Sequence, residues 1–397
     1  MKNFIIYFCI FFFFPSIVFS QEIQKTGYIF TPVKTLKTTP VKNQYKSGTC
    51  WSYAATSFIE TELLRMGKGE FDLSEIYFVR NAYIEKAIDY IRYHGTSNFG
   101  QGGQAHDVIN IARKYGFTPE SAYKGIEYQE SGHIHMELEE VLKAFLNAIK
   151  ENPNKKLSTV WLKAYTNIID AYLGTIPNNF KFNNKDVTPI EFQKELQFNP
   201  DDYIEITSYA HHPFYSSFIL EIPDNWSKGL YFNVPINELI QIIDNAINNG
   251  YSVVWDGDVS DKGFSHSNGV AIIPEKKLED MNNTERSKWE KLSDSERNKM
   301  LYKFDEPQSE KVITQDDRQI VFDNYTVTDD HLMHFTGIVK DQNNTKYYVT
   351  KNSWDSTSNK FGGYLNISES FAKLNTVAIM IHKDALSKEM KSKLGIK

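Results

Sequence analysis

Cys50 is a candidate nucleophile because of its position in the sequence. It follows Ser47-Gly48-Thr49 and precedes apolar residues at helical spacing, so we expect it at the N-terminus of an amphipathic helix. The positive end of the helix dipole and the unpaired backbone N–H groups there favour a thiolate and lower the pKa of a thiol. A lone cysteine is more commonly a small buried apolar residue. The choice therefore depends on whether a base and its partners are present.

Two histidines and one asparagine supply candidates for those partners. His331 and His334 lie in a segment that predicts a strand, and Asn352 follows the next predicted strand. Side chains three positions apart on a strand point to opposite faces, so only one of the two imidazoles is expected to face the cysteine. A cysteine nucleophile needs a base, a group that orients the base and a donor for the developing oxyanion. These residue types predict acyl transfer.

The segment from Gln44 to Tyr53 resembles the Gln-x5-Cys-Trp-[Ser/Ala]-[Phe/Tyr] motif of papain-like cysteine peptidases. The resemblance implies that Cys50 is the nucleophile and that the Gln44 side chain and the Cys50 backbone N–H form the oxyanion hole. In the family the catalytic histidine lies six residues before a glycine, which implies His331 as general base and acid, since 337 − 331 = 6. His334 is the remaining alternative.

Further motifs extend this resemblance. Asn352-Ser353-Trp354 is similar to the family's Asn-Ser-Trp motif, which implies that Asn352 orients the histidine and that Trp354 shields their hydrogen bond from water. Gly102-Gly103 resembles the double glycine that lines the family's substrate cleft, where a missing side chain lets a peptide backbone approach. An ordinary glycine loop is the alternative at that position.

Within the papain-like class the chain resembles the bleomycin hydrolase and aminopeptidase C group. The resemblance is carried by Val254–Ser260, similar to that group's Trp-x-x-x-Asp-Val segment, and by the long insertion at about 124–250. It implies a peptide substrate trimmed from its N-terminus, with the C-terminal carboxylate, here that of Lys397, pairing with the substrate's α-ammonium group. The tail is shorter than the group's arm, and Asp355 replaces the family's usual glycine. An endopeptidase and an inactive peptide-binding relative remain as alternatives.

The elements that must position these residues are helical first and stranded later. Helical patterns cover Leu73–Arg92, Gln104–Tyr115, Met136–Tyr172 with a break at Pro153, and 236–248. Strand patterns cover 251–255, 333–339, 347–351, 363–367 and 376–381. We expect an α+β papain-like fold over 21–397, with a helical lobe at about 44–250, a β-barrel-like lobe at about 251–397 and the cleft between them. The charged stretch 276–317 predicts a solvated, partly helical excursion.

Residues 1–20 are typical of a secretory signal peptide. Lys2 precedes an apolar run that Pro15 interrupts and that is shorter than the roughly 20 residues of a membrane-spanning helix. Cleavage after about Ser20 would remove Cys9, leaving Cys50 as the only cysteine of the mature chain. We therefore expect a protein secreted to the periplasm or the outside of the cell, with no stable membrane association.

Composition excludes several other classes of function. The formal net charge is −6, and loss of Lys2 makes it −6 − 1 = −7, without a basic block, so nucleic acid is not an expected partner. His211-His212, His133-x-His135 and His106 offer imidazoles, but none has the His-Glu-x-x-His spacing of a zinc peptidase. We expect no metal and no cofactor. The sequence leaves the oligomeric state open, homo-oligomers included.

Overall fold

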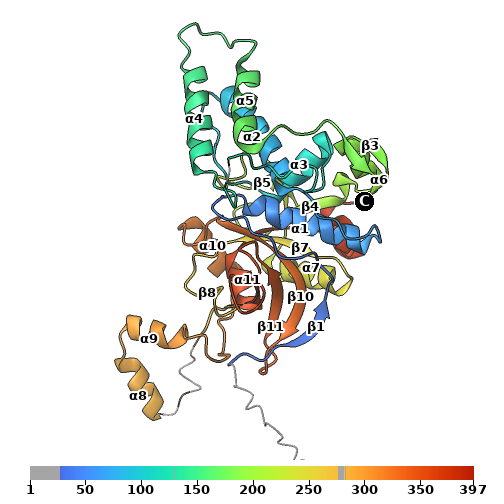
Figure 1. Cartoon of the computed structure of the whole chain (residues 1–397). Helices are drawn as coiled ribbons and strands as arrows, with labels where there is room; N and C mark the ends of the chain where they lie inside the picture. The colour runs from blue at the N-terminus through green and yellow to red at the C-terminus, as the bar shows by residue number, and fades with distance from the viewer. Residues whose placement is uncertain (1–26, 129, 276–280, 282) are drawn as a thin grey trace, which may run out of the picture.

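The computed structural model describes residues 27–128, 130–275, 281 and 283–397. The predicted signal peptide, residues 1–20, lies outside them. Among the described helices, none is both long and apolar enough to cross a membrane. One side of the molecule is helical and the other is built on a sheet (Figure 1).

The described strands form one 11-stranded sheet and a small hairpin. The sheet runs in the order β5-β6-β4-β13-β7-β10-β11-β12-β9-β8, and β1 pairs with β10 outside this path. The bounds of its strands are β1 Thr31–Thr35, β4 Tyr203–Thr207, β5 Ser217–Ile219, β6 Leu230–Asn233, β7 Val253–Gly257, β8 Phe264–Ser265, β9 Val270–Ala271, β10 His331–Lys340, β11 Lys346–Lys351, β12 Tyr364–Ser368 and β13 Thr376–His382. The hairpin is β2 Phe180–Phe182 with β3 Lys185–Val187.

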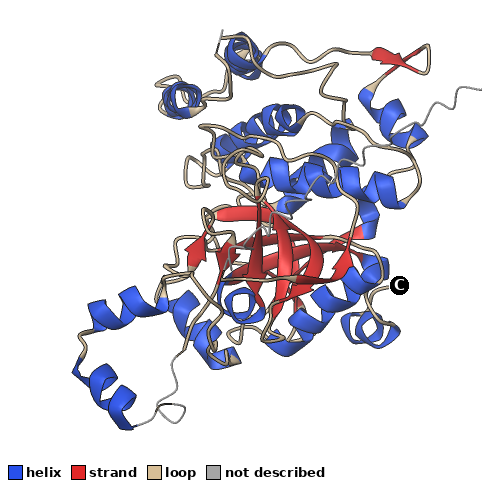
Figure 2. Ribbon diagram, turned by 60° about the horizontal axis from the view of Figure 1, so that its bottom comes forward, coloured by secondary structure: helices blue, strands red, loops and turns tan. Residues whose placement is uncertain are grey.

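Helices cover both faces of the sheet (Figure 2). The helical lobe contains α1 Cys50–Arg65, α2 Glu75–Arg92, α3 Ala105–Tyr115, α4 Met136–Lys150, α5 Trp161–Leu173 and α6 Pro189–Glu195. The other face carries α7 Ile236–Asn248, α10 Gln315–Asp323, α11 Glu369–Asn375 and α12 Lys388–Leu394. The excursion formed by α8 Asn283–Lys291 and α9 Asp294–Leu301 projects from the body, as the charged sequence predicts (Figure 1).

Successive side chains of the central strands belong alternately to two separate hydrophobic cores. Leu332 of β10 and Val254 of β7 pack into the core of the helical lobe. Their neighbours Met333 and Trp255 pack with α7 and α11 on the opposite face. This period of two is what a strand buried on both faces requires. The α+β architecture with a helical lobe and a β lobe is therefore confirmed.

The boundary between the lobes differs from the expected position near residue 250. The chain enters the sheet at β4, which starts at Tyr203 and pairs with β13, and α7 packs against the sheet as well. At the other end of the sequence, β1 precedes residue 44 and pairs with β10. Short strands separated by irregular loops, such as β4 to β6, carry too little alternation to be assigned from sequence alone.

Candidate active site

Cys50 opens α1, the helix that lies between the two lobes. Fourteen of the sixteen residues of α1 are buried, so the helix is packed on nearly all sides. Trp51 fixes its first turn, because the indole Nε1 donates to the Gln101 carbonyl oxygen at 2.9 Å. The Cys50 thiol is 9% exposed and lies next to the backbone N–H of Leu332. The structure therefore places Cys50 against the first residues of β10.

His331 and Asn352 are hydrogen-bonded to each other. His331 is the first residue of β10 and Asn352 follows β11, its antiparallel neighbour, and Nε2 of the imidazole lies 2.8 Å from Oδ1 of the amide. The Trp354 ring covers this pair, with its centroid 4.8 Å from that of the His331 ring. The use of Nε2 toward Asn352 leaves Nδ1 of His331 for another partner.

His266 also contacts this group, although no sequence motif marked it. Its Nδ1 lies 3.4 Å from Nδ2 of Asn352, and its ring centroid lies 5.0 Å from that of Trp354. An imidazole on the Nδ2 side of the amide leaves Oδ1 to face His331. His266 belongs to the loop after β8, where sequence periodicity gives no indication of its direction.

His334 lies on the side of β10 that faces α1. Its Nδ1 is 3.0 Å from Oγ of Ser57, and its ring packs edge-on against Phe58. Burial and the nearby Lys351 ammonium lower the pKa of His334 well below its usual value. His334 is therefore held in the interior between the lobes, separate from the pair of His331 and Asn352.

Gln44 is joined to the turn that carries Asn352. Its backbone N–H donates to the Ser353 carbonyl oxygen at 2.8 Å, and its Oε1 accepts from the Ser353 hydroxyl at 2.6 Å. Its Nε2 donates one hydrogen bond to the Ser47 carbonyl oxygen at 2.8 Å. The amide nitrogen is thus directed to the loop that leads into Cys50, with its second N–H not used in that bond.

Burial opposes charge on both Cys50 and His331. The pKa of the Cys50 thiol is raised to about 12, chiefly by burial and also by Asp329, Asp224 and Asp256, while the Leu332 N–H acts in the opposite direction. Burial lowers the pKa of His331 to about 4, against the effect of the Asn352 hydrogen bond. The expected acidification by the helix N-terminus is thus outweighed here by desolvation and by like-signed neighbours.

The missing side chains of Gly102 and Gly103 let other side chains of the protein pack closely against this segment. A Cβ on Gly103 would lie 3.1 Å from the Trp51 ring, and a Cβ on Gly102 would lie 1.9 Å from Oδ2 of Asp224. Gly103 therefore permits close packing on the helix that carries Cys50, and Gly102 lies directly under a carboxylate. Sequence patterns did not identify Asp224, which belongs to an irregular loop.

The C-terminal tail packs away from Cys50. Helix α12 buries Met390 and Leu394 in the core that α7 shares, and Lys393 Nζ lies 3.1 Å from Oε1 of Glu238 on α7. The preceding strand β13 ends at His382, which stacks on Tyr251 and thereby lies near Arg65, the last residue of α1.

That end of α1 is fifteen residues from Cys50, about 22 Å along the helix. The predicted role of Lys397 in binding substrate therefore disagrees with the structure. The apolar side chains of the tail, Met390 and Leu394, are buried against α7, and this packing holds the terminus there.

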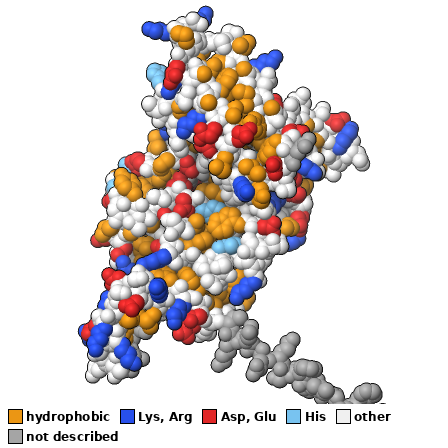
Figure 3. Space-filling view, turned by 60° about the vertical axis from the view of Figure 1, so that its left-hand side comes forward, with side chains coloured by type: hydrophobic (Ala, Val, Ile, Leu, Met, Phe, Trp, Pro, Cys, Tyr) orange, Lys and Arg blue, Asp and Glu red, His pale blue; other side chains and the backbone are white. Residues whose placement is uncertain are grey.

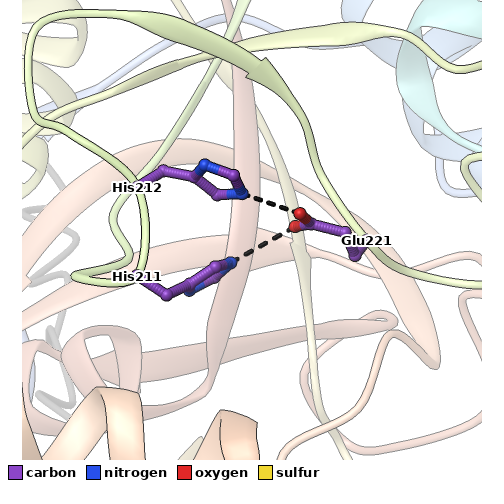
Figure 4. A group of neighbouring side chains, drawn as sticks. All are labelled: His211, His212 and Glu221. Atoms are coloured by element: carbon purple, nitrogen blue, oxygen red, sulfur yellow. Dashed lines mark hydrogen bonds and ion pairs between the residues drawn. The ribbon is translucent and has the colours of Figure 1, made fainter.

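The other candidate histidines form no metal-binding group with His331: His133 and His135 pack edge-on against each other with ring nitrogens that have no hydrogen-bond partner among the described residues, and His106 binds Glu205 and Ser227. His211 and His212 both face Glu221, with Nε2 to carboxylate distances of 3.2 and 2.7 Å (Figure 4). Two imidazoles and a carboxylate are a donor set that zinc accepts. However, Gln319 donates its Nε2 to Nδ1 of His211, and its Oε1 accepts from the Ala210 N–H. This network places the His211 proton on Nε2, where it points at Glu221 and blocks a metal bond.

Behind the site, a second group of charged residues is buried against α1. Lys42 Nζ contacts Oε1 of Glu60 at 3.2 Å and Oε1 of Glu75 at 2.7 Å. Glu60 also accepts from the Leu73 N–H at 2.8 Å, and Lys351 donates to the Ser57 hydroxyl at 2.7 Å. We call Lys42, Glu60, Glu75 and Lys351 the rear cluster. Both signs of charge are present in it, and their hydrogen bonds are made.

Comparison with known proteins agrees with this architecture. Residues 17–302 match the model of the Peptidase C1-like family. The chain belongs to that family. It is 23% identical over 291 residues to bleomycin hydrolase of Gallus gallus, a match that covers 62% of this chain and 64% of that protein. The matched part is thus somewhat less than two thirds of that relative's length.

Two further similarities cover more of the chain. Aminopeptidase G of Lactobacillus delbrueckii subsp. lactis is 22% identical over 402 residues, covering 91% of this chain and 84% of that protein. The crystal structure of pepw from Lactobacillus rhamnosis superposes with a TM-score of 0.70 at 20% identity, covering 92% of this chain and 84% of that one. The second similarity concerns the fold.

Proposed function

We propose that this protein is a cysteine peptidase that removes residues from the free N-termini of peptides. The observation that carries the proposal is the contact between Asn352 Oδ1 and His331 Nε2 at 2.8 Å, with the Cys50 thiol beside the N–H of Leu332, the next residue. Nδ1 of His331 is then the nitrogen available to the thiol. The family supplies the reaction class, and the name of aminopeptidase G supports the preference for N-termini.

In this reaction the thiol proton passes to Nδ1 of His331 as sulfur attacks the peptide carbonyl carbon. Burial disfavours either charge alone, so the thiolate and the imidazolium form together as a pair. The negative oxygen of the tetrahedral adduct accepts hydrogen bonds from the Cys50 N–H and the second N–H of Gln44 Nε2. His331 returns its proton to the leaving nitrogen, and the C–N bond breaks to give a thioester on Cys50.

Hydrolysis of the thioester restores the enzyme. His331 takes a proton from water, the oxygen attacks the thioester carbon, and the C–S bond breaks with return of the proton to sulfur. Asn352 keeps the imidazole ring in one orientation through both half-reactions. Trp354 covers the hydrogen bond that does so, which keeps competing water away.

The test of this chemistry uses the thiol. One equivalent of iodoacetamide should abolish hydrolysis of aminoacyl-aminomethylcoumarin substrates, and peptide mapping should find the label on Cys50. Cys50→Ala should be inactive while its thermal unfolding matches that of the unmodified protein. Hydrolysis that persists in Cys50→Ala would contradict the cysteine mechanism.

An endopeptidase is the second candidate, and the position of the tail favours it. Since α12 packs on α7, the chain terminus does not close the cleft beside Cys50. Digestion of one peptide library in free and N-acetylated form, with sequencing of the products, separates the two activities. Release of single residues from free peptides alone supports the aminopeptidase, and equal internal cleavage of both libraries supports the endopeptidase.

We also propose that the mature protein is secreted, to the periplasm or outside the cell. The proposal rests on the charged and apolar pattern of residues 1–20. N-terminal sequencing of the protein recovered from cell fractions tests it. A start near Gln21 in an extracytoplasmic fraction is the expected result, and an intact Met1 in the cytoplasm would contradict it.

A further inference from the structure

A carboxylate is built into the cleft at the glycine pair next to Cys50. Oδ2 of Asp224 lies 1.9 Å from the position that a Cβ of Gly102 would take, so the carboxylate sits directly on that glycine. Gly103, the next residue, packs on the ring of Trp51, which adjoins Cys50. Asp224 therefore lies on the wall that we expect a substrate backbone to follow.

The loop that carries Asp224 is fixed to the helical lobe. Asn98 Nδ2 donates to Oδ1 of Asp224 at 3.0 Å. Two later side chains of the same loop bind one carboxylate of α3: Trp226 Nε1 donates to Asp107 Oδ2 at 2.9 Å, and the Ser227 hydroxyl donates to Oδ1 at 3.0 Å. These bonds hold the Asp224 carboxylate in place before any ligand arrives, at no further ordering cost on binding.

A second carboxylate reaches the same segment from the β lobe. Asp329 lies two residues before His331, and its Oδ2 accepts from Nε2 of Gln104 at 2.8 Å. Gln104 directly follows Gly103 in the sequence. Asp224 and Asp329 thus approach the segment 102–104 from the two lobes. Figure 3 shows acidic and histidine side chains bordering the hollowed waist between the lobes.

Asp256 adds a third carboxyl group, which is hydrogen-bonded to Asp329. It lies opposite Leu332 in the pairing of β7 with β10, and it is 3% exposed. No N–H group of a described residue donates to it. Burial and the neighbouring Asp329 raise the pKa of Asp256 well above its usual value, so these two carboxyl groups share one proton and carry one negative charge between them.

The positive charge nearest to the glycine segment is already engaged. Lys86 is buried behind it, and its Nζ donates to the carbonyl oxygens of Gly100 and Gly102. It offsets part of the Asp224 charge. The Lys86 ammonium and the proton shared by Asp256 and Asp329 leave one negative charge among the three carboxyl groups, and a buried negative charge is costly unless a cation pairs with it.

The geometry of a peptide substrate places its N-terminal ammonium group near these carboxyl groups. In a peptide attacked by Cys50, the nitrogen of the residue that donates the acyl group is about 2.5 Å from the attacked carbon. In the first residue of a chain that nitrogen is an ammonium group. We propose that Asp224, Asp256 and Asp329 form the subsite that binds the α-ammonium group of the substrate's N-terminal residue.

This inference rests on the proposed aminopeptidase function and deepens it. The carboxylates take the role that the resemblance assigned to the C-terminal carboxylate, which here lies with α12 on α7. An N-acyl group replaces the cation with a neutral amide and leaves the carboxylates unpaired, so the same subsite rejects blocked peptides.

The experiment measures kcat/KM for alanyl-aminomethylcoumarin, its N-acetyl derivative and an N-acetyl-arginyl-alanyl derivative. Asp224→Asn is the main variant, because its loop is half-exposed and the change keeps the Asn98 contact site. Asp329→Asn is the second. Asp294→Asn on α9, 94% exposed, is the matched control. Stoichiometric labelling of Cys50 by iodoacetamide is measured for every variant.

Asp224→Asn and Asp329→Asn should each lower kcat/KM for the free substrate by about 30-fold or more, mainly through KM, as loss of a desolvated charge pair does. The N-acetyl derivative should be hydrolysed no more slowly than by the unmodified protein, and Asp294→Asn should change nothing. Equal losses on free and acetylated substrates, or no loss on either, would overturn the subsite.

The remaining outcomes separate the subsite from the function that it serves. A preference of the unmodified protein for the N-acetyl-arginyl substrate, lost in Asp224→Asn, would assign the carboxylates to a basic side chain of an endopeptidase substrate and overturn the ammonium subsite. No hydrolysis of any substrate together with unlabelled Cys50 would overturn the proposed function itself.

Discussion

Two groups of buried charge adjoin α1, and they differ in how far they are satisfied. The rear cluster contains Lys42 and Lys351 beside Glu60 and Glu75, and hydrogen bonds join its members to one another and to the backbone. The group in front of Cys50 is formed by Asp224, Asp256 and Asp329, and the Lys86 ammonium with one proton shared by Asp256 and Asp329 does not balance its charge. A cluster that balances its own charge serves the fold, whereas one that does not is suited to a ligand.

The two histidines of β10 give the largest expected difference, because His331 lies beside Cys50 and His334 lies near the rear cluster. His331→Ala should lower kcat by about 1,000-fold or more, as expected when the proton carrier of a nucleophile is removed. His334→Ala removes a group that contacts Ser57 near the rear cluster, so it should keep most activity and lose stability. Steady-state kinetics with thermal unfolding distinguish the two. Inactivity of His334→Ala with an active His331→Ala would show that the roles are reversed.

The rear cluster is tested by removing one of its acids. Glu60→Ala removes one of the three acidic partners of Lys42, which keeps Glu75 and Asp72, and takes the acceptor from the Leu73 N–H. Breaking a buried pair in this way should reduce the free energy of unfolding by about 3 kcal/mol. Denaturant unfolding at pH 7 measures the change. The ratio of activity on free and acetylated substrates should not move, and a changed ratio would argue that the rear cluster also contacts substrate.

The front group is tested by pH. The pKa of Asp329 is raised to about 7, chiefly by burial and then by the charges of Asp224 and Asp330, against the hydrogen bonds that Asp329 makes with Asp256 and Gln104. A raised pKa means that the carboxyl group is neutral below about pH 7 and binds an ammonium group poorly there.

From pH 6 to pH 7.5, kcat/KM for the free substrate should therefore rise about fivefold more in the unmodified protein than in Asp329→Asn. Above pH 7.5 the substrate amine itself loses its proton, so the comparison stops there. If the pH profiles of kcat/KM for the two proteins are parallel, Asp329 does not belong to the subsite.

The smallest expected effect is a gain in stability. Because the folded pKa of Asp329 lies above its unfolded value near 4, the folded state binds the extra proton between about pH 4 and pH 7, and stability falls as pH rises through that window. Asp329→Asn should remove this cost and stabilise the substrate-free protein at pH 8 by about 1–2 kcal/mol. The gain should vanish below pH 4. Calorimetry at pH 8 and pH 3.5 measures both.

Sequence reasoning succeeded where the information is local. The residues of Gln44–Tyr53 are contiguous, and the helix after Cys50 follows from apolar spacing. Strands β10, β11 and β13 alternate over enough positions to be assigned with nearly their observed bounds. The family and the fold could be predicted for this reason. The chemical roles of Cys50, His331 and Asn352 stay predictions until the variants are measured.

The rest depends on contacts between distant segments. Asp224 occurs in a loop without periodicity, and only the folded chain brings it onto Gly102. Lys42 lies in a Pro- and Lys-rich segment without periodicity, and only the folded chain brings its ammonium to Glu60 and Glu75. Neither position carries a local signal, because burial of a charge is decided by its partners.

The bond between Gln44 and Ser353 also has a consequence for when the enzyme first acts. These residues are 309 positions apart, and this contact orients the Gln44 amide together with the local bond to Ser47. Contacts of such separation form late, since the ends of a long loop must first meet. Under the proposed mechanism, a chain that has left the ribosome only as far as the helix of Cys50 still lacks its base, and activity is expected only once the last strands have emerged.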